Sequence, residues 1–236
     1  MSKHLSALTG LVVSLAFAAG PVFAGDVTGT ITYTGKVPNL KPIAMNADPV
    51  CASKHTAPVP SEVLVLGPAN AMANVMVRVK GPVAGSFPVP AQPAVIDQKG
   101  CQYHPHVLGL RVGQTLQLKN SDGLLHNVHA LPKVNTPFNM AMPANRTTAD
   151  SKFPKAEGMF LVKCDVHPWM NAYVGVFTNP FFAVSGKDGK YKISGLPPGT
   201  YEIEAWHEKL GVQTAKVTVA AAKPGAANFS FAPPTK

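Results

Sequence analysis

One short stretch of the sequence holds three side chains that are good ligands for a copper ion. Cys164, His167 and Met170 lie in the run Cys-Asp-Val-His-Pro-Trp-Met, and His126 lies well upstream in His-Asn-Val-His. Electron-transfer copper centres use two imidazoles and a thiolate in a near-trigonal plane with a weak, long axial thioether, because soft sulfur and borderline nitrogen suit both Cu(I) and Cu(II). These side chains therefore predict a mononuclear copper site.

Two separate segments must position these ligands. The apolar residues 160–163 predict a strand that leads into Cys164, and the alternating residues 172–178 predict the next strand. His126 follows another expected strand, residues 115–120, after a polar turn. We therefore expect three ligands on one loop between strands and the fourth on a neighbouring segment, held together by a rigid scaffold.

The spacing of the ligands resembles that of the cupredoxin family. The chain has Asn-Ser-Asp before His126-Asn127 and then Cys-x-x-His-x-x-Met, and the short loop is most similar to amicyanin-like members. The resemblance covers residues 105–178. It implies one copper per chain, with His126, Cys164 and His167 as equatorial ligands and Met170 as the axial ligand. It also implies that Asn127 braces the thiolate loop by hydrogen bonding.

The same resemblance implies a route for electrons. In cupredoxins the second histidine ligand emerges through an apolar patch that docks the redox partner, and small, weak interfaces suit rapid turnover. Carried over to this chain, electrons would pass through the edge of His167, flanked by Pro168 and Trp169.

A second unit is expected after the ligand loop. Asp188-Gly189 lies between two strand-like runs and is a strong hairpin signal. The following Leu-Pro-Pro-Gly-Thr-Tyr turn resembles carboxypeptidase regulatory-like, transthyretin-type β-sandwiches, over about residues 180–233. We therefore predict an all-β chain: a cupredoxin-like Greek-key sandwich with an N-terminal β extension over residues 25–178, followed by a small noncatalytic sandwich over residues 179–236.

The N-terminus predicts secretion. Lys3 and His4 precede the apolar run 5–18, and Val-Phe-Ala ends at Ala24, which is the pattern of a cleavable signal peptide over residues 1–24. The run is too short to span a bilayer, so we expect a periplasmic protein without stable membrane insertion after cleavage.

The cysteine count is odd, which is unusual in an oxidising compartment unless one thiol is occupied. If copper binds Cys164, then Cys51 and Cys101 remain as a disulfide pair. The alternative pairings would consume Cys164 and abolish the copper site.

Other metal chemistries fit the sequence less well. Structural zinc sites need four Cys, three Cys with one His, or two of each at characteristic spacings, and the three Cys of this chain lie far apart. Covalent haem attachment needs Cys-x-x-Cys-His, which the sequence lacks. A binuclear copper centre needs two bridging cysteines in the loop, and multicopper oxidases carry His beside the Cys, where this chain has Lys163 and Asp165. We therefore expect an electron carrier and not an enzyme.

Further His and Met residues leave a second copper site open as a hypothesis. We interpret Trp206-His207-Glu208 as a packing or domain contact. The residues that could contribute to a second copper site are His104, His106, His129, Met140 and Met142.

The charge and the ligand set together suggest partners and alternatives. The formal charge is +9 and becomes +8 when Lys3 leaves with the signal peptide, so acidic periplasmic redox proteins such as a cytochrome c or a dehydrogenase are expected partners. Nucleic acid is excluded because a basic-aromatic reading motif is missing. Two alternatives stay open: a periplasmic copper-delivery protein that carries the metal as cargo, and a structural or adhesive β-sandwich pair.

Overall fold

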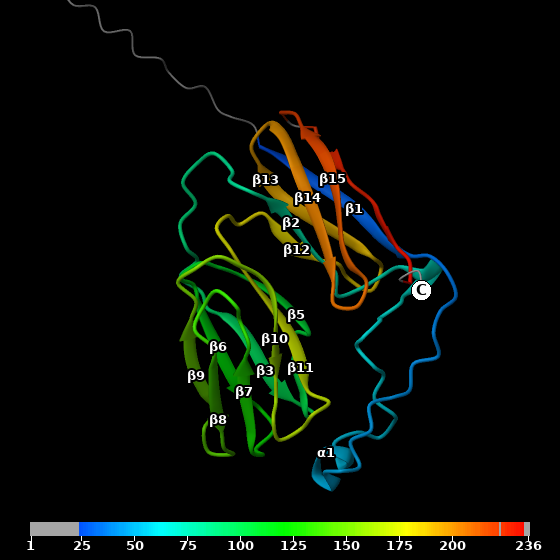
Figure 1. Cartoon of the computed structure of the whole chain (residues 1–236), viewed down its shortest axis with the longest axis vertical. Coiled ribbons are helices and arrows are strands. Elements are labelled where there is room, and N and C mark those ends of the chain that lie inside the picture. Colours follow the sequence, from blue (N-terminus) through cyan, green and yellow to red (C-terminus); the bar gives the residue numbers. More distant parts are fainter. Residues whose placement is uncertain (1–23, 222, 234–236) are drawn as a thin grey trace, which may run out of the picture.

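The computed structural model describes residues 24–221 and 223–233, so the predicted signal peptide lies, except for its last residue, outside the described part. Strands dominate, and the predicted all-β sandwich fold is confirmed. Figure 1 shows two β units stacked along the long axis of the molecule. Within the described residues, no helix has the length and apolar character needed to cross a membrane.

We call the first of the two units the middle unit, because it is formed by the middle of the chain, residues 94–177. One sheet has the strand order β5 (Val107–Arg111), β11 (Asn171–Phe177), β10 (Glu157–Lys163), β7 (His126–Ala130) and β8 (Phe138–Met142). The other has the order β4 (Gln102–His104), β3 (Ala94–Lys99), β6 (Thr115–Asn120) and β9 (Thr148–Lys152). The β5–β11 and β3–β6 pairs are parallel and the remaining pairs are antiparallel.

The core of the middle unit lies between its two sheets. Leu116 and Leu118 alternate along β6 and meet Val128 and Val162 from the opposite sheet, and all four are almost fully buried. Strand side chains alternate between faces, so this apolar periodicity of two fixes which face of each strand is inside.

The terminal unit combines both ends of the chain. One sheet pairs β13 (Lys190–Leu196), β1 (Gly25–Tyr33) and β16 (Gly225–Ala226), and β17 (Phe229–Phe231) also pairs with β1. The other has the order β12 (Phe182–Val184), β2 (Met76–Lys80), β14 (Gly199–His207) and β15 (Gly211–Val219).

The pairing of strands does not follow the expected division at residues 178 and 179. β1 pairs with β13 and β2 pairs with β14, so the N-terminal β segments complete the terminal unit and do not extend the middle one. Their apolar faces, with Val27 and Ile31 on β1 and Val77 on β2, pack in the same core as Ile193 and other residues after 179. Local alternation reveals a half-buried strand but not its partner, and the sequence left that choice open.

A long strap connects β1 to β2. We use this name for residues 34–66, which leave the terminal unit, run to the far end of the middle unit and return (Figure 1). At the far end lies the short helix α1 (Pro49–Ser53), and a 3-10 turn (Pro68–Asn70) follows the strap. The side chain of Asp48 caps α1 by accepting from the backbone N–H groups of Val50 and Cys51 at 2.9 and 3.2 Å.

The strap is fixed to the middle unit by a covalent bond. The expected disulfide joins Cys51 of α1 to Cys101, and Cys164 is the free cysteine within the described residues. Met45 of the strap is buried in the core of the middle unit together with Cys51. The cross-link closes a loop with a sequence separation of 50 residues, for which the chain-entropy model gives about 4 kcal/mol.

A buried ion pair joins the two units. His106, just before β5, meets Glu208, just after β14, with 2.6 Å between Nε2 and Oε1, and both side chains are at most 4% exposed. The hydroxyl of Tyr173 donates to the other carboxylate oxygen of Glu208 at 3.1 Å, and its ring lies 5.1 Å from that of Trp206. The Trp206-His207-Glu208 segment thus includes a contact between the units, as its sequence suggested.

The neighbouring carboxylates of Glu208 and Glu62 determine the direction in which the pKa of His106 shifts. Burial alone would lower the pKa of His106, but the hydrogen bond with Glu208 and the charges of Glu62 and Glu208 outweigh burial and raise it. Protonated His106 therefore stabilises the fold. This contribution is complete below the unfolded-state pKa of about 6.5 and is lost as the pH rises through the higher folded-state pKa.

We expect His106→Gln to lower the free energy of unfolding by about 3 kcal/mol at about pH 5.5, the usual scale for breaking a buried pair, and by less at about pH 9. Urea unfolding of the metal-free protein at both pH values measures the difference. Glu202→Gln is the control, because the pair between Lys80 and Glu202 is largely exposed and should contribute at most about 1 kcal/mol at either pH. An equal loss for His106→Gln at both pH values would contradict the assignment.

Candidate metal centre

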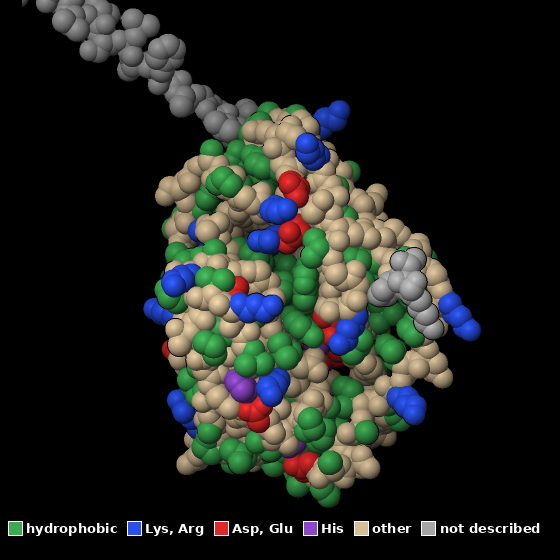
Figure 2. All heavy atoms as spheres, in the orientation of Figure 1, with side chains coloured by type: hydrophobic (Ala, Val, Ile, Leu, Met, Phe, Trp, Pro, Cys, Tyr) green, Lys and Arg blue, Asp and Glu red, His purple; other side chains and the backbone are tan. Residues whose placement is uncertain are grey.

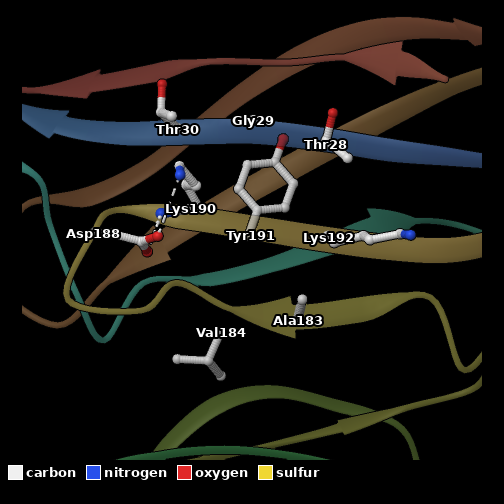
Figure 3. Close-up of a pocket in the computed structure, with 9 residues that line it drawn as sticks. All are labelled: Thr28, Gly29, Thr30, Ala183, Val184, Asp188, Lys190, Tyr191 and Lys192. Atoms are coloured by element: carbon white, nitrogen blue, oxygen red, sulfur yellow. Dashed lines mark hydrogen bonds and ion pairs between the residues drawn. The ribbon is translucent and has the colours of Figure 1, made fainter.

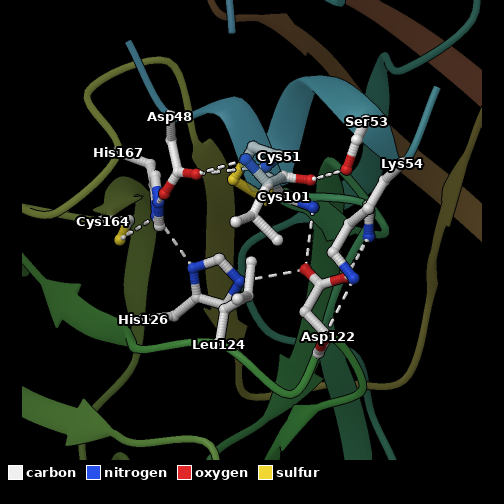
Figure 4. The surroundings of a disulfide bond; sticks show 12 residues. Asp48, Cys51, Ser53, Lys54, Cys101, Asp122, Leu124, His126, Cys164 and His167 are labelled. Carbon is white, nitrogen blue, oxygen red and sulfur yellow. Dashed lines mark hydrogen bonds and ion pairs between the residues drawn. A yellow bond between two sulfur atoms is a disulfide. The ribbon is translucent and has the colours of Figure 1, made fainter. Parts of the chain in front are cut away.

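The structure brings His126, Cys164 and His167 together at the end of the middle unit that α1 covers (Figure 4). One ligand atom from each residue lies within 4.8 Å of the others. The Nδ1 atoms of the two imidazoles are 2.9 Å apart, and Nδ1 of His167 is 3.7 Å from Sγ of Cys164. All three residues are at most 2% exposed, so the donor atoms form a single buried cluster.

Strand register places the cysteine in this cluster. Lys163 at the end of β10 pairs with Asn171 at the start of β11, so residues 164–170 form the loop between these antiparallel strands. The backbone N–H of Cys164 donates to the carbonyl of Met170 at 3.1 Å, and the N–H of Met170 donates to the carbonyl of His167 at 2.9 Å. The loop is therefore closed by hydrogen bonds at its base.

His126 arrives from the neighbouring strand. It is the first residue of β7, which pairs with β10, and this pairing brings its imidazole beside the loop. Met170 is 1% exposed and packs in the same apolar core as Cys164, at the end of the loop where β11 begins. That Met170 is the axial ligand stays a prediction.

Asn127 braces the loop through its side chain. Its Oδ1 accepts from the backbone N–H of Asp165 at 2.7 Å and from Sγ of Cys164 at 3.3 Å. Its own carbonyl accepts from the buried hydroxyl of Tyr103. The amide thus links β7 to the loop beside the cysteine.

Two carboxylates that the sequence did not single out hold the outer nitrogens of the imidazoles. Nε2 of His126 lies 2.9 Å from Asp122, and Nε2 of His167 lies 3.1 Å from Asp48 (Figure 4). Asp122 lies in the polar turn before His126, where the spacing of four residues was a usable signal. Asp48 is 119 residues away from His167, and only its helix-capping pattern is visible in the sequence.

Asp122 is itself held by many donors. It accepts from the backbone N–H groups of Gly100 and Cys101 at 2.7 and 2.8 Å and pairs with Lys54 at 3.3 Å. Burial would raise the pKa of Asp122, but these contacts and His126 lower it well below its usual range. The carboxylate is therefore a fixed negative charge behind His126.

The electrostatics of the cluster favour a thiolate beside an imidazolium. Burial would raise the pKa of the Cys164 thiol, but hydrogen bonds from the side chain of His126, from the backbone of Asn127 and from the backbone and side chain of His167 outweigh burial and lower it to about 7. Burial would lower the pKa of His126, but Asp122 and Cys164 raise it to about 9. The two shifts have the same origin, because a positive charge on the imidazole favours the thiolate and a negative charge on the sulfur favours the imidazolium.

The predicted exit residues lie at this end of the molecule but differ in exposure. His167 is 2% exposed, and Asp48 contacts the imidazole edge from the strap. Pro168 is exposed, whereas Trp169 is half-buried and donates from Nε1 to the carbonyl of Cys101 at 3.1 Å. The edge that was expected to face a partner is therefore covered by the strap.

The residues considered for a second copper site do not join the cluster. His106 is engaged by Glu208, and His129 pairs with Asp165 at 2.9 Å near the surface. Met142 is buried in the core of the middle unit, and Met140 packs against that core. The groups of His, Cys, Asp and Glu found among the described residues with metal-binding spacing all include His126 or His167.

An open hollow lies on the terminal unit, where β1, β12 and β13 meet (Figure 3). Its wall includes Thr28, Lys192 and the ring of Tyr191, and it contains none of the predicted site residues.

Similar solved structures are cupredoxins and a copper enzyme. A Cu(I) form of a variant of amicyanin is 22% identical, covers 43% of this chain and 98% of its own, and gives a TM-score of 0.33. A purple cupredoxin from Nitrosopumilus maritimus is 23% identical over 36% of this chain and 99% of its own, with a TM-score of 0.30.

The copper enzyme is a copper-containing nitrite reductase from Thermus scotoductus SA-01. It is 24% identical over 41% of this chain, gives a TM-score of 0.32, and is matched over only 25% of its own length. No family model matches the sequence, and no curated protein sequence matches it. The case for a metal in this chain therefore rests on its own side chains.

We expect Asn127→Ala to lower the free energy of unfolding of the metal-free protein by about 1–3 kcal/mol, because the backbone N–H of Asp165 loses its acceptor. Urea unfolding measures the loss. Asn145→Ala is the control, because Asn145 is exposed in the turn between β8 and β9, and its removal should cost no more than about 0.5 kcal/mol. Equal losses for the two variants would contradict the bracing role.

Proposed function

We propose that this protein is a mononuclear type 1 copper protein that transfers single electrons between redox partners. The observation that carries the proposal is the buried cluster of the His126 and His167 Nδ1 atoms with Sγ of Cys164. Both outer imidazole nitrogens are bound to carboxylates, so the two Nδ1 atoms are the ones left to face a metal.

The donor set fits copper. Two imidazoles and one thiolate, with a buried thioether at the end of the same loop, combine borderline and soft ligands. Bound copper would supply the one-electron change between Cu(II) and Cu(I). The protein would hold the metal through His126, Cys164 and His167, with Met170 as the weak axial ligand.

The scaffold suits electron transfer because it restricts movement of the ligands. Cys164 and Met170 lie at the closed base of a loop between paired strands, and His126 begins a strand of the same sheet. Asn127 holds the loop from β7. Ligands fixed in this way change position little when the metal changes charge.

Burial of the cluster supports a resident metal more than a transported one. The three donor residues are at most 2% exposed, and the strap with its disulfide lies against them. Copper held as cargo would need a path to an acceptor. Because the donors are enclosed, we also propose an electron carrier and not an enzyme.

Partners and compartment follow from charge and from the site end of the molecule. Lys and Arg side chains are spread over both units on the face shown in Figure 2 and are interleaved with acidic ones. Val50, Leu125 and Val166 are exposed, and they directly precede Cys51, His126 and His167 in the chain. A small apolar contact there, with weak steering by the net positive charge, suits an acidic periplasmic cytochrome c or dehydrogenase.

We expect the purified protein titrated with Cu(II) to develop an intense thiolate-to-copper absorption band at one copper per chain, with a type 1 electron paramagnetic resonance spectrum. Cys164→Ser should abolish the band, and His167→Ala should change both the colour and the rate of electron exchange. His129→Ala is the matched control and should keep the wild-type spectrum, because this imidazole pairs with Asp165 near the surface.

A weak spectrum that does not depend on Cys164 would contradict the proposal. Rapid loss of bound copper to an acceptor protein would instead favour copper as cargo.

A further inference from the structure

The strap reaches the candidate metal centre from outside the middle unit. Asp48 and Lys54 flank α1, and both make contacts behind the imidazoles (Figure 4). Asp48 meets Nε2 of His167 at 3.1 Å, whereas Lys54 meets Asp122, the partner of His126, at 3.3 Å. One segment therefore contributes to the surroundings of both imidazoles.

The outer nitrogen of each imidazole meets a carboxylate, but Asp122 belongs to the middle unit and Asp48 belongs to the strap. Asp122 is fixed by backbone donors of its own unit and is 2% exposed in its side chain. Asp48 is 32% exposed in its side chain and is held by its capping bonds to α1. The contact to His167 therefore depends on where α1 is placed.

The disulfide decides where α1 is placed. Cys51 lies three residues after Asp48. It is buried in the core of the middle unit and is bonded there to Cys101. The backbone N–H of Cys101 is bound to Asp122, and the Cys101 carbonyl accepts from Trp169. The sulfur atoms of Cys51 and Cys101 are within 4.8 Å of a nitrogen of His167. The cross-link thus ties Asp48 to the network that holds the other imidazole.

We propose that Asp48 is a positioning residue for the copper ligand His167, delivered by the strap and kept in place by the disulfide between Cys51 and Cys101. The inference rests on the proposed copper function. A carboxylate that accepts the Nε2 proton fixes the ring orientation and makes Nδ1 a stronger donor. It also adds negative charge near the metal, which favours Cu(II) over Cu(I) and lowers the reduction potential.

Two substitutions distinguish the effect of the negative charge of Asp48 from the effect of its contact with His167. Asp48→Asn keeps a helix cap and an acceptor near His167 but removes the charge, whereas Asp48→Ser keeps the cap and is too short to contact the imidazole. Asp188→Asn is the control, because Asp188 is an exposed carboxylate in a turn of the terminal unit.

We expect Asp48→Ser to reduce the ratio of Cu(II) to Cu(I) affinity at least tenfold, which corresponds to a rise of about 59 mV in the reduction potential. Asp48→Asn should give a smaller rise, and Asp188→Asn should leave the potential unchanged. Redox titration of the thiolate-to-copper band measures all three. Wild-type potentials in both Asp48 variants would overturn the proposal.

A second measurement uses the metal-free protein. The Nε2 proton of His167 should exchange slowly with solvent in the wild type, because it is donated to Asp48 in a side chain that is 3% exposed. Nitrogen-15 NMR should detect it, and Asp48→Ser should speed its exchange at least tenfold. Unchanged exchange would overturn the contact itself. If the wild-type protein formed no thiolate-to-copper band, the proposed function would fail while this measurement still decided the contact.

The role of the cross-link is tested by the double variant Cys51→Ser with Cys101→Ser. It should raise the potential in the same direction as Asp48→Ser, and Asp48→Ser should then add less than it does in the wild type. Retention of the copper band shows that the double variant is folded. If the double variant had the wild-type reduction potential while Asp48→Ser had a shifted one, the claim that the disulfide keeps Asp48 in place would be wrong.

Discussion

The arrangement of the molecule depends on the burial of two imidazoles and a thiol at one point. Buried polar groups are tolerated only when each finds a partner, and here both nitrogens of each ring are engaged. The inner nitrogens face each other and Cys164, and the outer ones meet Asp122 and Asp48. Several features of the fold satisfy this requirement: the polar turn before β7, the closed loop after β10 and the strap with its disulfide.

Much of the candidate site could be predicted because its information is local. Cys164, His167 and Met170 fall within one loop, and the preceding strand could be recognised from its apolar residues. The disulfide was predicted because assigning Cys164 to copper leaves two of the three cysteines, and it is present between Cys51 and Cys101.

The remaining features depend on contacts between residues far apart in the sequence. Asp48 gives no local sign that it meets His167, and the alternation of β1 does not reveal that β13 is its partner. The burial of the His167 edge has the same origin, because the segment that covers it comes from the strap. Periodicity identifies a strand and its buried face, but partner choice is decided by the whole core.

The terminal unit is connected to the candidate site through β11. This strand begins directly after Met170, and its third residue, Tyr173, donates to Glu208 of the terminal unit. The carbonyl of Asn171 also lies 3.2 Å from Nδ1 of His106, which is the partner of Glu208. The contact between the units therefore lies against the strand that follows the ligand loop.

The order of the strands along the chain gives the protein the architecture of a domain insertion. The middle unit, residues 94–177, is inserted between β2 and β12, which pair with each other in the terminal unit. Because β2 and β12 are neighbouring strands, the two ends of the inserted middle unit (the guest) lie close together in the terminal unit (the host). Insertions are tolerated where the two ends of the inserted domain are close. The guest is nevertheless incomplete when excised, because Asp48 and Cys51 belong to the host segment that precedes β2. The strap therefore has to be retained in any minimal fragment meant to preserve the surroundings of His167.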